Sequence, residues 1–224
     1  MWQEKRKDQT VGRSVLRKLG RGIAIASASF AAFVGVAAIA PASAQLYSDG
    51  YKFLEAVDER DGDTVTQMLN EPGTTVINAR DITTGDTGLH VVAKRRDVLW
   101  IRFLLQRGAD PNIRNRNGLT PIQVATTLGF VDGVEELIKG GAQVNVTDQQ
   151  GETPLIAAVH QRNVELVRRF LAQGANPDQN DNSGRSARDY AELMNGNERI
   201  MQEFAAADAN REKEGTTRQY GPSF

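Results

Sequence analysis

The sequence predicts an all-α fold, a solenoid of stacked helix pairs, because one pattern recurs at a constant interval. Thr87, Thr120 and Thr153 stand thirty-three residues apart, and Ser186 follows at the same step. Two series of glycines keep the same period: Gly85, Gly118, Gly151 and Gly184, and Gly108, Gly141 and Gly174. One unit of this size cannot bury its apolar face alone, so the pattern indicates that equal units pack side by side.

Three consecutive units carry the pattern most clearly. They contain TGLHVV from Thr87, TPIQVA from Thr120 and TPLIAA from Thr153, and each is followed by GAD, GAQ or GAN at the same offset. These units closely resemble ankyrin repeats. The resemblance covers roughly residues 46–204 and is strongest over residues 81–180. It implies an ankyrin-repeat solenoid of paired antiparallel helices joined by β-turn loops, and protein binding as the mode of action.

The first 44 residues are expected to be an export signal. They contain seven bases and two acids, and an apolar run occupies residues 22–40. Ala42 and Ala44 then form the A-x-A pattern that signal peptidase accepts, so cleavage is expected between Ala44 and Gln45. The alternative is an uncleaved anchor, because a run of about 19 apolar residues is nearly long enough to span a bilayer. The repeats are accordingly expected in a bacterial periplasm or secreted, or held at the inner membrane facing the periplasm.

About five units with degenerate end caps are expected in residues 45–204. Their approximate limits are 46–81, 82–114, 115–147, 148–180 and 181–204. Terminal repeats are commonly atypical, because one of their faces has no neighbour. In the first unit Phe53 and Val65 mark two helix faces, and Gly62 with Asp63 is expected to form the turn between them. Residues 205–224 are charged, small or polar, with little to bury, and are expected to be a disordered tail.

Apolar positions at helical spacing predict the core of each unit. Leu137 and Leu171 are expected to be buried on the second helices of the third and fourth units. Trp100 is expected to fill the core rather than act as an exposed anchor, because aromatic side chains fill cores well. Glu136 and Arg169 stand where the family usually has an aliphatic residue, and are expected at the groove edge or facing solvent.

Composition and motifs argue against catalysis, a metal and a cofactor. The chain has no cysteine, which excludes disulfides and Cys-type zinc sites. His90 and His160 are the two histidines, and no second ligand joins either of them at metal-binding spacing. The resemblance implies that His90 ties neighbouring loops by hydrogen bonds. His160 is expected near the surface. No phosphate-binding loop, dinucleotide fingerprint or nucleophile elbow is present.

Charge argues against nucleic acid as a partner. Residues 45–224 hold 20 bases and 26 acids, a net charge of −6, whereas general nucleic-acid binding requires a basic surface. Within residues 94–116, however, seven bases accompany two acids. This run is either an ordinary solvated face or a basic patch that steers an acidic partner or an anionic lipid surface.

The remaining function is recognition of another protein by a monomeric scaffold, with no cofactor. In the family, partners contact the loop tips and the inner face of the first helices. Carried onto this sequence, the predicted contact residues are Thr84, Asp86, Lys94, Arg95, Arg116, Asn117, Leu119, Leu128, Gln149, Gln150, Glu152 and Gln161, with Thr83, Thr127 and His160 beside them. Leu119 and Leu128 are expected to be exposed, either as binding hot spots or as scattered surface apolar residues. The second functional reading is a membrane-tethered structural protein of the envelope, retained by its apolar amino-terminal segment.

Overall fold

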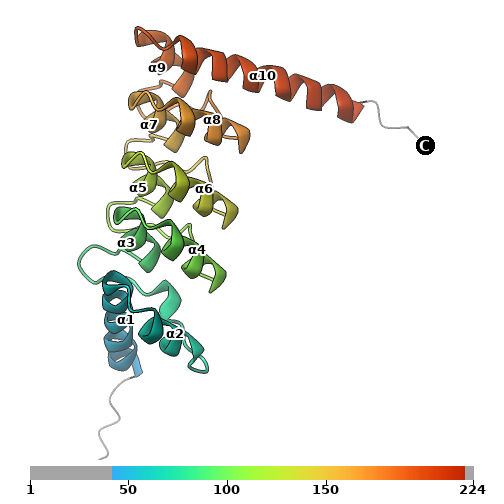
Figure 1. Cartoon of the computed structure of the whole chain (residues 1–224). Helices are drawn as coiled ribbons and strands as arrows, with labels where there is room; N and C mark the ends of the chain where they lie inside the picture. The colour runs from blue at the N-terminus through green and yellow to red at the C-terminus, as the bar shows by residue number, and fades with distance from the viewer. Residues whose placement is uncertain (1–41, 220–224) are drawn as a thin grey trace, which may run out of the picture. The chain divides into compact units, whose positions relative to one another are not determined.

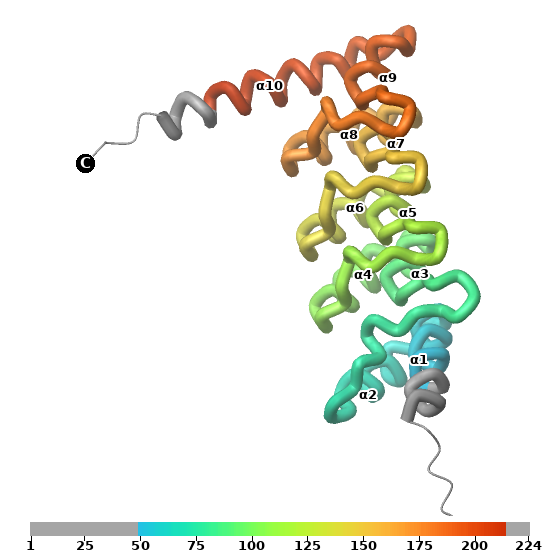
Figure 2. Tube along the Cα trace, turned by 180° about the vertical axis from the view of Figure 1, so that it is seen from behind, coloured from blue at the N-terminus to red at the C-terminus, as the bar shows by residue number. Residues whose placement is uncertain are grey.

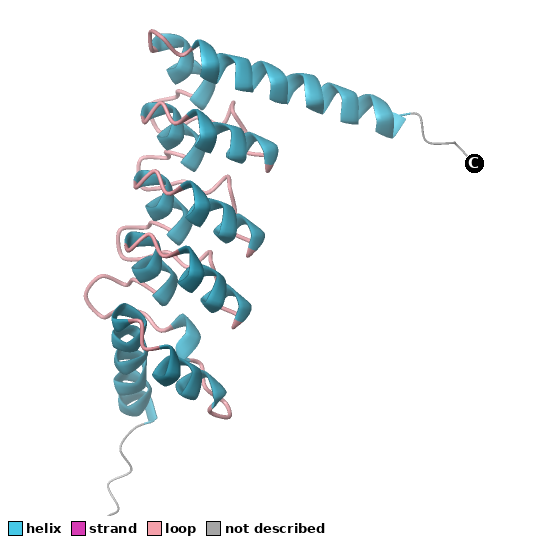
Figure 3. Ribbon diagram, viewed as in Figure 1, coloured by secondary structure: helices cyan, strands magenta, loops and turns pink. Residues whose placement is uncertain are grey.

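The computed structural model describes the backbone of residues 42–219 and the side chains of residues 49–213. Within that range the chain forms ten α-helices and one short 3-10 helix, with no strand (Figure 3). The helices are α1 (Ala42–Glu59), α2 (Gly62–Asn70), η1 (Val76–Asn78), α3 (Gly88–Lys94), α4 (Val98–Gln106), α5 (Pro121–Thr127), α6 (Val131–Lys139), α7 (Pro154–His160), α8 (Val164–Ala172), α9 (Ala187–Leu193) and α10 (Glu198–Gln219). The predicted all-α solenoid is confirmed.

Five successive helix pairs stack along the described part of the chain (Figure 1). The first helices α3, α5, α7 and α9 form an inner row, and α4, α6, α8 and α10 form an outer row. Each inner helix packs against its own outer helix, and α3, α5 and α7 each pack against the inner helix of the next unit. The tube view in Figure 2 shows the connecting loops returning on one side of the stack. The contacts therefore join each repeat to the repeats directly before and after it in the chain, as in other repeat arrays.

A continuous apolar core runs through the stacked units. Phe53, Ile101, Leu137 and Phe170 are fully buried in four successive units, and Leu171 is nearly so. The burial of Leu137 and Leu171 confirms their predicted core positions. Trp100 is partly buried and packs against this core, as predicted.

The first unit differs from the sequence-based expectation at its turn. Gly62 and Asp63 are the first residues of α2 rather than the turn before it. The turn lies at Arg60, which has a φ of 63°, and at Asp61, whose carboxylate accepts a hydrogen bond from Thr64 N at 3.0 Å. Asp61 is thus the N-cap of α2. The predicted position of the turn was wrong because the acidic cap, and not the glycine, sets the start of the helix.

The disordered tail expected over residues 205–224 is corrected for residues 205–219, because α10 continues to Gln219, and residues 220–224 lie outside the described residues. Its alanines and charged residues are strong helix formers, although they offer few side chains to bury. The helix is also attached to the array, because Arg211 donates to the carbonyl of Ala175 at 2.9 Å and Ala207 packs against the core. Apolar content alone underestimated the helical order of this segment, because it takes no account of helix propensity or of polar contacts.

Ion pairs cross the outer row from α4 to α10. Glu136, expected at the groove edge or facing solvent, has a side chain that is only 11% exposed because Arg102 and Lys139 cover it. Arg169 remains about half exposed. The successive pairs are Arg102–Glu136, Glu136–Lys139, Lys139–Glu135, Glu135–Arg169, Arg169–Glu165, Glu165–Arg168 and Arg168–Glu203.

The predicted signal segment lies almost wholly outside the described residues. The described chain begins at Ala42, and the backbone of α1 includes the bond between Ala44 and Gln45. None of the helices in residues 42–219 combines the length and apolar character that a membrane span requires.

Candidate functional site

The inner helices begin at hydroxyl residues that recur with the period of the sequence. Thr87, Thr120, Thr153 and Ser186 are the N-caps of α3, α5, α7 and α9. In three of these helices the side chain three residues later completes the cap. Gln123, for example, accepts a hydrogen bond from Thr120 N at 3.0 Å. These caps satisfy backbone groups that a helix start leaves without partners, and they fix the direction in which each loop enters its helix.

His90 completes the cap of α3 and also joins two repeats. Its Nδ1 accepts a hydrogen bond from Thr87 N at 3.1 Å, which leaves Nε2 to donate to the carbonyl of Leu119 at 2.9 Å. The ring is fully buried. Burial lowers the pKa of His90, although the bond to the Leu119 carbonyl opposes that shift. The structural role that the resemblance implied for this histidine is confirmed.

The loop tips lie against one another closely enough to form backbone hydrogen bonds. Arg116 N donates to the carbonyl of Thr84 at 2.9 Å, and Asn182 N donates to the carbonyl of Gln150 at 3.0 Å. Gly85 makes the first approach possible, because its φ is 72° and a Cβ there would lie 2.8 Å from Arg116 N. The tips therefore form a fixed edge instead of independent loops.

An asparagine ladder ties the other ends of the loops. Asn78, Asn112 and Asn145 each accept, through the side-chain oxygen, a backbone N–H from the following unit at 2.8–2.9 Å. Asn112 also donates to the carbonyl of Gly141 at 3.1 Å. Each bond replaces water at a backbone group and fixes the spacing between units.

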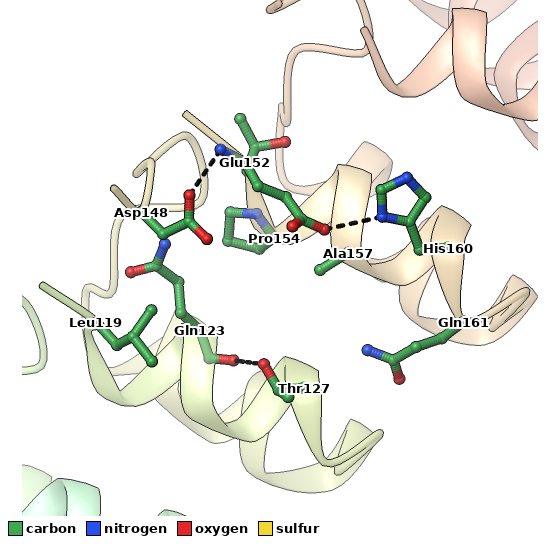
Figure 4. A pocket seen from close by; sticks show the side chains of 10 residues that line it. Leu119, Gln123, Thr127, Asp148, Glu152, Pro154, Ala157, His160 and Gln161 are labelled. Atoms are coloured by element: carbon green, nitrogen blue, oxygen red, sulfur yellow. Dashed lines mark hydrogen bonds and ion pairs between the residues drawn. The ribbon is translucent and has the colours of Figure 1, made fainter. Parts of the chain in front are cut away.

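A groove of about 200 Å³ opens between the third and fourth units (Figure 4). Leu119, Gln123 and Thr127 line one side, from α5 and the loop before it. On the other side Glu152 and His160 face the same space in Figure 4. Its walls combine a proline and an alanine with carboxylate, amide and imidazole groups, which suits contact with a mixed polar and apolar surface.

His160 is held at the rim of this groove. Its Nδ1 lies 3.1 Å from Glu152 Oε1, and its ring meets that of Tyr190 edge-on with centroids 4.4 Å apart. The side chain is 41% exposed, which agrees with its predicted surface position. The His160 imidazole is thus held at the rim by Glu152 of the fourth unit and Tyr190 of the fifth.

The basic residues of the 94–116 run mostly make contacts within the chain. Arg96 donates to the carbonyl of Leu128, Arg102 pairs with Glu136 at 2.9 Å, and Arg114 donates to the carbonyl of Thr147 at 2.7 Å. Each of these contacts reaches the following repeat. Arg95 donates instead to the carbonyls of Val57 and Asp58 in the preceding unit. The run therefore ties repeats together, which accounts for most of its charge.

Several predicted contact residues are exposed on the side of the loop tips and inner helices. They are Thr84, Lys94, Arg116, Asn117, Gln149, Gln150 and Gln161, with Thr83, Thr127 and His160. Gln123, Pro154 and Ala157 also line the groove but were missed. Gln123 and Ala157 stand at helical spacing from the cap residues Thr120 and Thr153, and Pro154 directly follows Thr153, so the caps could have identified them.

Other predicted contact residues are corrected by the structure. Asp86 is 4% exposed, pairs with Lys94 and accepts a hydrogen bond from Asn115 at 2.9 Å. Burial raises the pKa of Asp86, but these hydrogen bonds outweigh that effect and leave the pKa below its usual value. Its polar network therefore takes it out of the candidate contact surface.

Leu119 and Leu128 were expected to be exposed, and both instead are partly buried and pack against the core. Arg95 and Glu152 are likewise only partly exposed. The apolar side chains that are in fact exposed include Tyr51, Ile82, Leu99 and Leu193. Both leucines flank α5 and pack against the core there, which residue type alone does not reveal.

The described residues contain no group of His, Cys, Asp or Glu side chains that could hold a metal ion. In the groove between the third and fourth units, Asp148 accepts hydrogen bonds from backbone N–H groups, and Glu152 lies beside His160. The geometry is that of a contact surface for a macromolecule.

Comparison with known proteins supports the same assignment. A family model described as ankyrin repeats (3 copies) matches residues 53–148 and 129–214. The chain is 41% identical over 76 residues to oxysterol-binding protein homolog 1 of Saccharomyces cerevisiae, covering 33% of this chain and 6% of that protein. It is 36% identical over 85 residues to the human 2-5A-dependent ribonuclease, covering 37% and 11%. A putative ankyrin repeat protein of fowlpox virus is 40% identical over 50 residues, covering 22% and 15%.

The chain spans only a small fraction of the length of these relatives, so the likeness concerns repeats and not whole proteins. The family model, by contrast, covers well over half of the chain. The chain therefore belongs to the ankyrin-repeat family, whose repeats act as scaffolds for protein–protein interaction.

Proposed function

We propose that this protein is a non-catalytic protein-binding scaffold of the bacterial cell envelope. It grips its partner with the loop tips and the inner faces of the first helices. The observation that carries this proposal is the fixed edge of loop tips. Backbone hydrogen bonds join the second tip to the third and the fourth to the fifth, and the Gln149 side chain donates to the Asn117 carbonyl between the third and fourth, while Asn117, Gln149 and Gln150 stay exposed. A rigid edge loses little conformational freedom on binding, which favours recognition.

The envelope location rests on the amino-terminal sequence. A basic segment, an apolar run and the A-x-A pattern at Ala42 and Ala44 together are typical of an exported protein. The absence of cysteine is compatible with this location but does not require it. After cleavage the protein would act as a soluble periplasmic or secreted monomer.

The non-catalytic reading rests on the described grooves. In the groove between the third and fourth units, Asp148 accepts from the backbone N–H groups of Gln150 and Glu152, and Glu152 with His160 is the nearest approach to an acid–base pair. That pair lies at an exposed rim, and the Thr127 hydroxyl in the same groove donates to the Gln123 carbonyl and not to the pair. The match to the human ribonuclease covers only 11% of that protein, so its activity is not carried over to this chain.

Site-specific photo-crosslinking in cells tests the binding surface. A crosslinker at Gln150, on the loop edge, is expected to capture one defined protein. The same crosslinker at Gln106, exposed at the end of outer helix α4, is the matched control and is expected to capture none. Equal capture from both positions, or capture from neither, would overturn the proposed contact surface.

A second candidate keeps the repeats but makes the protein a membrane-tethered structural component. The apolar run at residues 22–40 is the observation in its favour, because about 19 apolar residues can nearly span a bilayer. Cell fractionation with amino-terminal sequencing separates the two. Gln45 as the first residue of a soluble protein supports release, whereas an intact amino terminus in the membrane fraction supports the tether.

A further inference from the structure

A second and larger groove lies between α1 and α3, in the first two units. Its volume is about 650 Å³. Leu54 and Val91 form part of an apolar lining, and Tyr51 stands at the rim with 60% of its surface exposed. An exposed tyrosine beside an apolar lining offers contact area at low entropic cost, which is typical of a binding surface.

The charge of this groove is negative and largely unneutralised. Glu55, Asp58 and Glu59 line it, are exposed, and have no ion pair or side-chain hydrogen bond within the described residues. They share one face of α1 with Tyr51, because the spacing of these four residues is helical. Neither cation of the groove forms an ion pair with these three carboxylates, because Lys94 pairs with Asp86, and Arg95 contacts Asp97 and donates to the main-chain carbonyls of Val57 and Asp58.

The arrangement of these carboxylates is unfavourable for the isolated protein. All three lie in the last turns of α1, where the helix dipole disfavours negative charge and α1 itself contributes no base; the cation at this end is Arg95, which donates to the carbonyls of Val57 and Asp58. Glu55 also stands three residues before Asp58 and four before Glu59, so like charges are neighbours on the helix surface. These carboxylates break the rules of helix-end charge and of like-charge spacing without forming a stabilising contact among the described residues. Such departures are expected at functional sites.

We infer that this groove binds a basic segment of the partner protein. Its Lys or Arg side chains would pair with Glu55, Asp58 and Glu59, and an apolar side chain would rest on the lining near Leu54. Tyr51 could also hold a cation over its ring. The inference rests on the proposed protein-binding function and adds the chemistry of the partner. This assignment replaces the acidic partner considered from the sequence, because most bases of the 94–116 run form contacts within the chain.

Binding of a fluorescent peptide with alternating Arg and Leu to the full chain tests this inference. The groove variant is Glu55→Gln/Asp58→Asn/Glu59→Gln, and affinity is expected to fall about tenfold, because three exposed charge pairs are lost. The control variant Glu71→Gln/Asp132→Asn/Glu198→Gln makes the same change in net charge at exposed positions outside the groove. It is expected to change affinity by about twofold or less. Added salt should weaken binding to the unmodified chain.

Folding is checked by thermal denaturation of both variants. The groove variant is expected to be at least as stable as the unmodified chain, because neutral side chains remove repulsion at the end of α1. Weaker binding by a stable variant supports the inference. Equal loss in both variants, or equal binding of a peptide in which Glu replaces Arg, would overturn it.

Two further outcomes assign the groove differently. If Lys5→Glu/Arg6→Glu/Lys7→Glu in the full chain raises peptide affinity, the chain's own amino-terminal bases occupy the groove, and the partner assignment is wrong. Crosslinking from Gln150 could capture a protein that binds the groove variant as tightly as the unmodified chain. The inference then fails, while the proposed scaffold function stands. Failure of all crosslinking removes the scaffold function itself.

Discussion

At the scale of single residues, His90 couples the stability of the array to pH. The buried ring accepts from Thr87 N and donates to the Leu119 carbonyl, which requires the neutral form. Its pKa is lowered in the folded protein, mainly by burial. Above the unfolded-state value of about 6.5 both states are neutral, and below it the unfolded chain binds a proton that the folded chain resists. The contribution of His90 to stability is therefore lost as pH falls below about 6.5.

The variant His90→Gln tests this coupling, because Gln123 performs the same capping role at the equivalent place in the third unit. The difference in unfolding free energy between the unmodified chain and the variant should shrink as pH falls from about 7 towards 5. Urea denaturation across that range measures it. A difference that stays constant with pH would show that His90 titrates alike in both states.

Core packing gives a second prediction at this scale. Leu137 is fully buried on α6, and Leu137→Ala should cost about 2–5 kcal/mol of unfolding free energy, because it deletes buried methyl groups and leaves a cavity. Leu193, which is 66% exposed, supplies the control, and Leu193→Ala should change stability by about 0.5 kcal/mol or less. Chemical denaturation of both variants compares them. Similar costs would contradict the placement of Leu137 in the core.

At the scale of elements, the ion pairs of the outer row link α4, α6, α8 and α10. Glu136 is central to them, and hydrogen bonding from Arg102, with Lys139 adding to it, lowers the pKa of Glu136 to about 2. A lowered carboxyl pKa stabilises the fold above the unfolded value of about 4.3, and this contribution is lost as pH falls towards 2. Because Arg102 is about half exposed, the pair is worth about 1 kcal/mol or less.

Glu136→Gln should therefore destabilise the protein by up to about 1 kcal/mol at pH 7 and have little effect near pH 2. High salt should also reduce the effect at pH 7. Glu192→Gln, at an exposed position on α9, is the control and should be neutral at both values. An equal loss at both pH values would mean that packing, and not charge, accounts for the role of Glu136.

Elements also show where sequence reasoning succeeds and where it stops. The recurrence of Thr87, Thr120, Thr153 and Ser186 locates four inner helices, because a cap is a local property of the chain. The length of α10 does not follow from apolar pattern, since contacts such as Arg211 to the Ala175 carbonyl depend on the folded array. The exposure of Leu119 could not be predicted either, because it depends on how closely the next repeat approaches.

At the scale of the whole molecule, the period predicted stacked equal units, and the resemblance of residues 81–180 to ankyrin repeats supplied the family and the interaction class. The candidate site could be predicted only in part. The loop tips at Gln149 and Gln150 follow from register, whereas the acidic groove requires knowing that Tyr51, Glu55 and Asp58 face the same space as Val91. The charge of the sequence indicated the bases of the 94–116 run as a possible binding patch. In the structure most of these bases contact other parts of the chain, so they no longer form such a patch.

The central claim is that equal units, each stabilised by its neighbours, form an array that carries the binding edge. Native-state hydrogen exchange tests this claim most directly, because it measures the free energy of opening at each amide. Amides of α5 and α7, which have neighbours on both sides, should be the most protected, and protection should decrease towards α2 and α9. Uniform protection from α1 to α10, as expected for one indivisible core, would contradict the account.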